Sequence, residues 1–220
     1  VRKEDSNEEA NFEIELSYPQ LSGTHPEIQE AINDGINKFI TDIRIDFEQN
    51  AFELGLTPDM GVPEEVKSQL FLTYANTLLS ERVLSFSFDV YTYIAGAAHP
   101  FPLRRGLSFD LESGGQLFFS DLFKEDSNYL EFISVKSIER LNEKLNPENE
   151  ETSTEWIESG AGPKSENYEE FYLSPDGLTI VFNVYQVTAY ALGTQEILLS
   201  YEELSPVLKE EFQVQKVLER

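Results

Sequence analysis

The chain of 220 residues contains no cysteine, one tryptophan and two histidines, His25 and His99. Without cysteine there can be no disulfide bond, no thiolate metal site and no cysteine nucleophile. A serine triad needs a histidine base, and neither histidine lies in an H-E-x-x-H or H-x-x-x-H motif. A zinc site would need both histidines to meet and recruit a carboxylate. Glycine-rich phosphate loops are also missing, so we expect no metal and no cofactor.

Basic residues are scarce: 16 Lys and Arg stand against 41 Asp and Glu, a formal net charge of −25. Nucleic acids and anionic membrane surfaces are bound by clustered basic side chains, so this charge argues against both as partners. It favours a basic partner or cations, or it serves solubility alone through self-repulsion. No D-x-[DN]-x-[DN]-G loop is present, so no calcium site can be placed.

Long apolar runs are missing as well. No stretch reaches the roughly 18 residues of a membrane-spanning helix, so we expect no transmembrane segment. Residues 1–11 are predicted to be a polar tail or linker, without the features of a signal peptide. We expect any export signal or anchor to be absent from this chain.

The composition is that of a folding chain, with 40% hydrophobic and 12% aromatic residues. Alternating apolar residues predict a first strand over residues 12–16. A long helix follows: Thr24 and Glu27 have capping-box spacing, Pro26 lies in the first turn, and the helix should end near Gly55. Its apolar stripe consists of Ile28, Ile32, Ile36, Phe39, Ile40, Ile43 and Phe47.

The rest of the chain alternates strands with a second helix. Strands are predicted over 70–79, 84–94, 107–111, 117–119, 178–187 and 195–201, a helix over 129–145 ended by Pro147, and a short helix from about residue 205. Residues 143–176 hold ten acids and two lysines, which predicts a solvated loop. Successive strands favour an α+β fold of antiparallel sheet, with the long N-terminal helix and the second, central helix packed on sheet faces.

This order of elements suggests four segments. Residues 12–120 form an N-terminal half of strand, long helix and strand meander. Residues 121–208 form a C-terminal half of helix, acidic loop and two strands, and residues 209–220 are the end of a C-terminal helix. The two halves are expected to form one unit, preceded by the tail or linker at 1–11.

Enzymatic chemistry without histidine would need carboxylates. A pair of Asp or Glu at a set separation is sufficient for glycoside hydrolysis, so a cell-wall polysaccharide hydrolase remains an alternative. Among 41 acids some pair will always look suitable, and solvated surface acids explain the same composition. Nothing in the sequence singles out a catalytic residue.

The segment Y-T-Y-I-A-G-A-A-H-P-F-P, residues 91–102, ends the long strand. His99 precedes a proline, which disfavours helical backbone there. In a structural interpretation, Gly96 and its alanine neighbours let another segment approach, and His99 bonds a backbone group. In a functional one, His99 lies on a ligand-facing loop flanked by Tyr91 and Tyr93. Trp156, in the acidic segment, is either a pin for that loop or an exposed contact.

These residues resemble a bacterial family. Residues 91–100 are similar to the motif Y-x-Y-x-G-G-A-H of an extracytoplasmic domain of unknown function, and S-F-D-L-E-S-G-G-Q and L-F-F-S-D-L-F follow in the family's order. The run F-Y-L-S-P-D-G-L-T-I-V-F-N-V-Y-Q-V-T-A-Y-A-L-G-T-Q-E-I-L-L-S-Y-E-E-L, residues 171–204, resembles its C-terminal motif. The family occurs in the ectodomain of RsiV, a lysozyme-sensing anti-sigma factor, and in the non-catalytic region of the deacetylase PdaC. The resemblance covers roughly residues 12–208.

The resemblance implies an α+β fold and a secreted or membrane-anchored, extracytoplasmic location. It also implies binding of lysozyme or another cell-wall-associated partner. The chain departs from the motifs at Ala95, at an extra alanine before His99 and at Ser200, and it has no sigma-binding segment. We therefore expect a non-enzymatic binding domain for a basic protein such as lysozyme or for cell-wall glycan, or else an accessory domain with no small ligand. The candidate binding residues are Tyr91, Tyr93, Gly96, Ala97, His99, Tyr185 and Tyr190.

Overall fold

The computed structural model describes residues 1–23, 25–63, 65–146 and 154–213. It divides into two compact units. Unit 1 comprises Val1–Ala75 and Phe88–Leu103, and unit 2 comprises Asn76–Ser87 and the chain from Arg104 onward. Residues 76–87 and 104–120 group with the C-terminal part of the chain in this division, and the expectation that the two halves form one unit stays a prediction.

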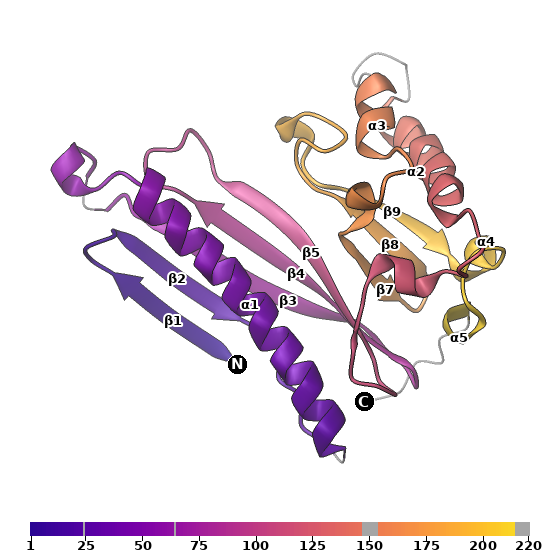
Figure 1. Cartoon of the computed structure of the whole chain (residues 1–220). Helices are drawn as coiled ribbons and strands as arrows, with labels where there is room; N and C mark the ends of the chain where they lie inside the picture. The colour runs from indigo at the N-terminus through magenta and orange to yellow at the C-terminus, as the bar shows by residue number, and fades with distance from the viewer. Residues whose placement is uncertain (24, 64, 147–153, 214–220) are drawn as a thin grey trace. The chain divides into compact units, whose positions relative to one another are not determined.

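The chain forms nine strands and five α-helices in the described residues (Figure 1). The strands are β1 (Arg2–Asn7), β2 (Phe12–Ser17), β3 (Ser68–Leu79), β4 (Val83–Tyr93), β5 (Phe101–Asp110), β6 (Gln116–Leu117), β7 (Phe171–Ser174), β8 (Gly177–Phe182) and β9 (Gln195–Ser200). The α-helices are α1 (Pro26–Leu54), α2 (Tyr129–Leu145), α3 (Thr154–Gly160), α4 (Tyr201–Leu204) and α5 (Glu210–Gln213). Short 3-10 helices are η1 (Pro58–Met60), η2 (Phe119–Leu122), η3 (Ser165–Tyr168) and η4 (Tyr190–Leu192).

The strands form two sheets, which confirms the α+β class. One has six strands in the order β1-β2-β3-β4-β5-β6, and the other has three in the order β7-β8-β9. Most pairs are antiparallel, as expected, but β2 and β3 are parallel, with Phe12 opposite Ser68 and Leu16 opposite Leu72. The long crossover through α1 returns the chain to the same end of the sheet, which makes this pair parallel.

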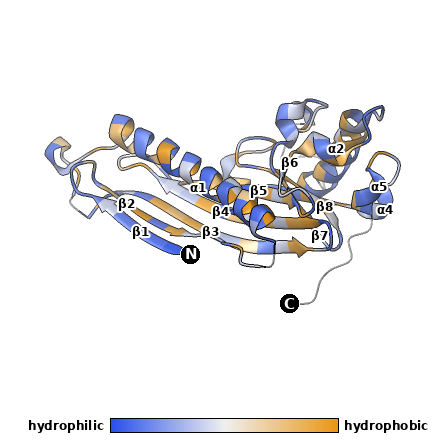
Figure 2. Cartoon of the chain, turned by 60° about the horizontal axis from the view of Figure 1, so that its bottom comes forward, coloured by the Kyte–Doolittle hydropathy of each residue, from blue (hydrophilic) through white to orange (hydrophobic). Residues whose placement is uncertain are grey.

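The N-terminal residues differ from the expected polar tail. Residues 2–7 form β1, an edge strand paired antiparallel with β2 from Arg2 opposite Ser17 to Asn7 opposite Phe12. β1 is hydrophilic along its length (Figure 2). Because β1 buries almost no side chain, its residues are polar and their composition suggested a tail. The segment is a strand because its backbone pairs with β2.

The core of unit 1 lies between α1 and one face of its strands. The predicted stripe of α1 is buried at Ile32, Ile36, Ile40, Ile43 and Phe47. The ring of Phe47 meets that of Phe12 at 5.7 Å between centroids, so α1 covers the β2 face that carries Phe12, Ile14 and Leu16. Thr24 of the expected capping box lies outside the described residues, and the N-cap, His25, makes no side-chain cap. The helix ends at Leu54, as predicted.

Unit 2 corrects the expectation of a solvated acidic loop. Residues 154–174 form α3, η3 and β7, and they bury Ile157, Tyr168 and Phe171 in one apolar cluster with α2 and β8. Four of its acids, Glu155, Glu158, Glu166 and Glu169, are exposed between these apolar residues, so the average composition hid the pattern. Residues 147–153, including Pro147, lie outside the described residues.

Other element boundaries also differ from the prediction. β5 begins at Phe101 instead of residue 107. β8 ends at Phe182 instead of residue 187, and 119 belongs to η2 instead of a strand. The chain after β9 forms two short helices, α4 and α5, instead of one helix from residue 205. None of the helices in the described ranges is long and apolar enough to cross a membrane.

Candidate functional site

The loop after β4 is built by backbone contacts within unit 1. The Ala95 N–H donates to Ser68 Oγ at 3.0 Å, and the Leu56 N–H donates to the Ala95 carbonyl at 2.9 Å. Gly96 has φ +94°, and a Cβ on it would lie 2.6 Å from Leu56 Cδ1. The glycine is therefore needed both for its left-handed backbone and for the close approach of Leu56. These contacts support the structural interpretation of this loop.

His99 and Ala97 lie on the exposed part of the same loop. The Ala97 N–H closes a turn onto the Ile94 carbonyl at 2.8 Å, and His99 Nδ1 lies 3.0 Å from the Pro100 carbonyl oxygen. In the residues that the structure describes, no three His, Cys, Asp or Glu side chains converge as metal ligands would. His99 therefore contacts a backbone carbonyl, as the structural interpretation expected, and its role on a ligand-facing loop stays a prediction.

Tyr91 belongs to a different feature, the side of the unit 1 strands opposite α1. Its ring is 37% exposed and lies 5.9 Å from that of Phe71 on β3. Alternation along β4 places Tyr93 on the same side. The spacing along β4 predicted that Tyr91 and Tyr93 share one side, but the contact of Tyr91 with Phe71 was not anticipated.

Carboxylates continue this row across the neighbouring strands. Glu15 is directly opposite Phe71 on β3 and opposite Glu4 on β1, so the row runs Glu4, Glu15, Phe71, Tyr91. Glu13 lies two residues along β2, on the same side, and accepts from Gln69 Nε2 at 2.6 Å. We call these five residues, Glu4, Glu13, Glu15, Phe71 and Tyr91, the acidic-aromatic face.

The acidic-aromatic face borders a hollow of about 400 Å³, lined mainly by β1, β2 and Phe71. One cation already lies there: the Arg2 guanidinium is 2.9 Å from Glu4 and 2.7 Å from Glu15. These pairs are solvent-exposed, so they cost little to exchange for another cation. Carboxylates beside aromatic rings attract ammonium and guanidinium groups through charge and through the ring face. The arrangement therefore suits Lys or Arg side chains of a partner.

Tyr185 and Tyr190 lie in unit 2, so the predicted binding residues divide between the two units. Their ring centroids are 5.6 Å apart, and Trp156 Nε1 donates to the Tyr185 carbonyl at 3.1 Å. Trp156 thus ties α3 to the loop that carries Tyr185, and its role as an exposed contact stays a prediction, with the residue 37% exposed. We call Trp156, Tyr185 and Tyr190 the aromatic platform.

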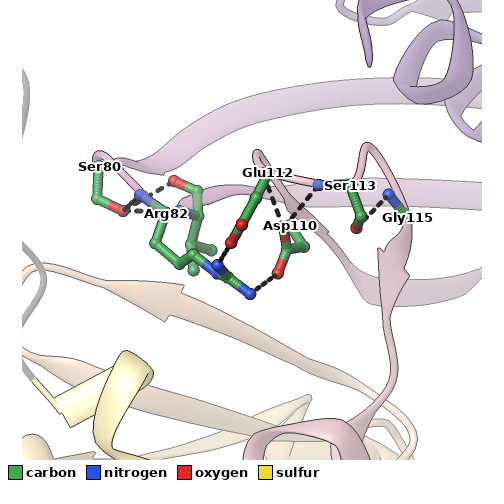
Figure 3. Close-up of polar contacts among 7 residues, drawn as sticks. Ser80, Arg82, Asp110, Glu112, Ser113 and Gly115 are labelled. Atoms are coloured by element: carbon green, nitrogen blue, oxygen red, sulfur yellow. Dashed lines mark hydrogen bonds and ion pairs between the residues drawn. The ribbon is translucent and has the colours of Figure 1, made fainter. Parts of the chain in front are cut away.

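A carboxylate pair is held by one arginine in unit 2 (Figure 3). Arg82 Nη2 lies 2.6 Å from Asp110 Oδ2, and Arg82 Nη1 pairs with Glu112. Asp110 Oδ1 also accepts the N–H groups of Glu112 and Ser113 at 2.8 and 3.0 Å. Asp110 therefore fixes the β5–β6 turn and joins it to the β3–β4 turn through Arg82. Its bonds are those of a structural clamp.

Glu170 is the other notable carboxylate of unit 2. Burial raises its pKa, while the charge of Arg105 and the Gly106 N–H oppose that rise. Arg105 Nε lies 2.5 Å from Oε1, and the Gly106 N–H donates to Oε2 at 3.1 Å. A raised carboxyl pKa is also found in catalytic acids. Here both oxygens are occupied by β5, so Glu170 ties β5 to the start of β7.

Two family profiles match successive parts of the chain. "Deacetylase PdaC" matches residues 5–101, and "Protein of unknown function (DUF3298)" matches residues 120–202. A curated relative, "Peptidoglycan-N-acetylmuramic acid deacetylase PdaC" of Bacillus subtilis (strain 168), is 27% identical over 146 residues. That alignment covers 66% of this chain and only 30% of the relative. The expected similarity to PdaC is confirmed, and that to RsiV stays a prediction.

Two solved structures share the fold. A DUF3298 family protein from Pseudomonas aeruginosa PAO1 superimposes with a TM-score of 0.67 at 10% identity, over 98% of this chain and 95% of that one. A DUF3298 family member from Bacteroides fragilis NCTC 9343 superimposes with a TM-score of 0.58 at 19% identity, over 90% and 85%. At these identities the likeness concerns the fold alone.

Proposed function

We propose that this chain is a non-enzymatic, extracytoplasmic, cell-wall-associated binding domain whose acidic-aromatic face binds a basic protein such as lysozyme. The cell-wall setting is supported by the matches to PdaC and DUF3298. The observation that carries the binding proposal is the row of Glu4, Glu15, Phe71 and Tyr91 across four strands. It combines charge for attraction with rings for contact.

The carboxylates and the aromatic rings of this face should affect binding in different ways. Exposed carboxylates mainly speed the encounter with a basic partner and lose effect as salt rises. Tyr91 and Phe71 supply rigid contact area that desolvates on binding, which is the kind of contact that sets the dissociation rate. A specific complex should therefore keep measurable affinity at physiological salt, whereas attraction by net charge alone should not.

The test is calorimetric titration with lysozyme at about 0.02 and 0.15 M salt, between which screening changes strongly. We expect saturable binding at both. Tyr91→Ala should weaken it roughly tenfold at the higher salt, as for a ring at the centre of an interface. Glu13→Gln with Glu15→Gln should mainly weaken it at the lower salt.

The matched control is Glu27→Gln with Glu30→Gln, which makes the same charge change at exposed positions of α1. At the lower salt it should weaken binding less than the pair on β2 does. If this control weakens lysozyme binding as much as the pair on β2, net charge explains the attraction and the proposed face is wrong. Binding that vanishes at the higher salt would contradict the proposal as well.

The absence of catalysis is tested separately, because a hydrolase acting through a carboxylate pair is the main alternative. Purified peptidoglycan incubated with the chain should release no new reducing ends above a buffer blank. Release that is abolished by Asp110→Asn or Glu170→Gln would overturn the non-enzymatic proposal and identify the pair. A domain that neither binds nor cleaves would be an accessory domain.

A further inference from the structure

The aromatic platform of unit 2 is held rigidly in place. The loop between β8 and β9 is tied down by Gln186, whose Nε2 donates to the Gly160 and Asn167 carbonyls at 3.0 Å each. A Cβ on Gly160 would lie 1.9 Å from the Gln186 carbonyl oxygen, so α3 ends directly against this loop. The same loop is bound to β5, where the Asn183 side chain bonds both the N–H and the carbonyl of Arg104 at 2.7 and 3.0 Å.

Tyr185 is presented in a conformation that costs free energy. Its φ is +69°, in the left-handed region, and it is 47% exposed. A non-glycine residue in that region is disfavoured by about 1 kcal/mol or more, and such strain gathers at functional sites. The neighbouring Val184 and Val187 are buried and fill the core, so the strained residue is the one that points to solvent. The fold therefore holds an aromatic ring at the surface at a cost in stability.

We propose that the aromatic platform binds a neutral polysaccharide through stacking on its pyranose rings. A pyranose has a flat face of C–H groups edged by hydroxyls, which fits flat exposed rings edged by phenol hydroxyl groups. Tyrosine and tryptophan offer such contact area with little loss of side-chain freedom. Glu155 and Glu158 are exposed on either side of Trp156 in α3, and they disfavour polyanions at this surface.

The polysaccharide site is separate from the acidic-aromatic face, since its residues all belong to unit 2. The proposed ligand of the aromatic platform is a chain of sugar rings and not a protein. Trp156 is the single tryptophan of the chain, so its fluorescence reports on the platform alone. A ligand that stacks on the platform should change that emission.

The test is a titration with chitohexaose, a neutral chain of pyranose rings, followed by tryptophan emission and by calorimetry. We expect a saturable emission change with a dissociation constant at or below about 1 mM. Tyr185→Asn removes the ring but keeps the carbonyl that Trp156 bonds, and asparagine tolerates left-handed backbone. This variant should bind roughly tenfold more weakly while its melting temperature stays equal or rises.

Two controls separate this proposal from the protein-binding one. Tyr91→Ala, in unit 1, should bind chitohexaose as the wild type does. Tyr185→Phe keeps the ring and should retain most of the affinity. No saturation in either readout, or undiminished sugar binding by Tyr185→Asn, would refute the polysaccharide site. So would a Tyr185→Asn variant whose affinity falls for lysozyme but not for the sugar, since the platform would then be a protein contact.

Discussion

Truncating Asp110 to alanine should strongly destabilise unit 2. The change removes two bonds from the Glu112 and Ser113 N–H groups and the ion pair with Arg82. The Asp110 side chain is only 10% exposed, so these bonds are shielded from water, whereas Arg82 is 34% exposed and partly rehydrates. Hydrogen bonds to a charged group contribute about 1.5–3 kcal/mol each, but turn N–H groups recover part of that from water. We expect a net loss of about 3 kcal/mol.

Two further variants divide this loss into its parts. Asp110→Asn keeps an acceptor for the two turn N–H groups and removes the charge, so about half of the loss should remain. Glu112→Ala removes the other carboxylate that pairs with Arg82. Because the Glu112 side chain is 75% exposed, this change should alter stability by less than about 1 kcal/mol. Both variants of the buried Asp110 should therefore cost more than the variant of the exposed Glu112.

The assay is urea unfolding followed by Trp156 fluorescence, because Trp156 lies in the same unit as the clamp. The urea midpoint should be lowered least by Glu112→Ala, more by Asp110→Asn and most by Asp110→Ala, with an unchanged slope of free energy against urea. If Glu112→Ala costs as much as Asp110→Ala, the exposed ion pair matters more than the buried turn bonds. That result would refute the assignment of Asp110 as the anchor of the turn.

Two other stability predictions follow from unit 2. A Cβ on Gly106 would lie 1.6 Å from the Phe171 carbonyl oxygen, so Gly106→Ala should cost several kcal/mol, measured as a loss of urea midpoint. Gly115→Ala is the control, because only the Ser113 hydroxyl is nearby; an equal loss there would contradict the reasoning. The Ser200 N–H bond lowers the pKa of Glu203. The stabilisation by ionised Glu203 is complete above the ordinary pKa of a glutamate and is lost as pH falls through the lowered pKa of Glu203. The melting temperature of Glu203→Gln should therefore depend less on pH than that of the wild type between about pH 5 and 3. An unchanged slope would exclude Glu203 as a source of acid sensitivity.

Several elements were predictable because one local pattern dominates them. The stripe of α1 recurs every three or four residues over the whole helix, and the turn at Glu112–Gly115 combines two glycines with a flanking serine. α2 was predicted with the same bounds as the structure shows, Tyr129–Leu145. In the two helices the apolar period is long enough to outweigh single exceptions.

Other elements depend on partners that are distant in sequence. β1 has almost no buried side chain, and only pairing with β2 shows that it is a strand. The acidic segment at 154–174 looked like a loop because its acids outnumber Ile157, Tyr168 and Phe171, which carry the packing. Composition averaged over a window cannot separate the buried positions from the exposed ones.

The candidate sites show the same limit. Tyr91 and Tyr93 were identified from alternation, but Glu15 meets Phe71 only because α1 places β2 parallel to β3. Trp156 and Tyr185 are 29 residues apart and are joined by one hydrogen bond. No spacing rule connects residues across such separations, so neither the acidic-aromatic face nor the aromatic platform could be predicted from the order of residues alone.

The sequence by itself determined the absence of cysteine chemistry, the −25 charge, the α+β class and the positions of the longest helices, because these depend on residue type and short-range periodicity. Tertiary structure alone decided that β1 is a strand and that acids and rings form one row in unit 1. It also decided that Tyr185 joins Trp156 and Tyr190 in unit 2. The physical reason is that strand register and loop closure are set by contacts between segments far apart in the chain, which no local pattern encodes.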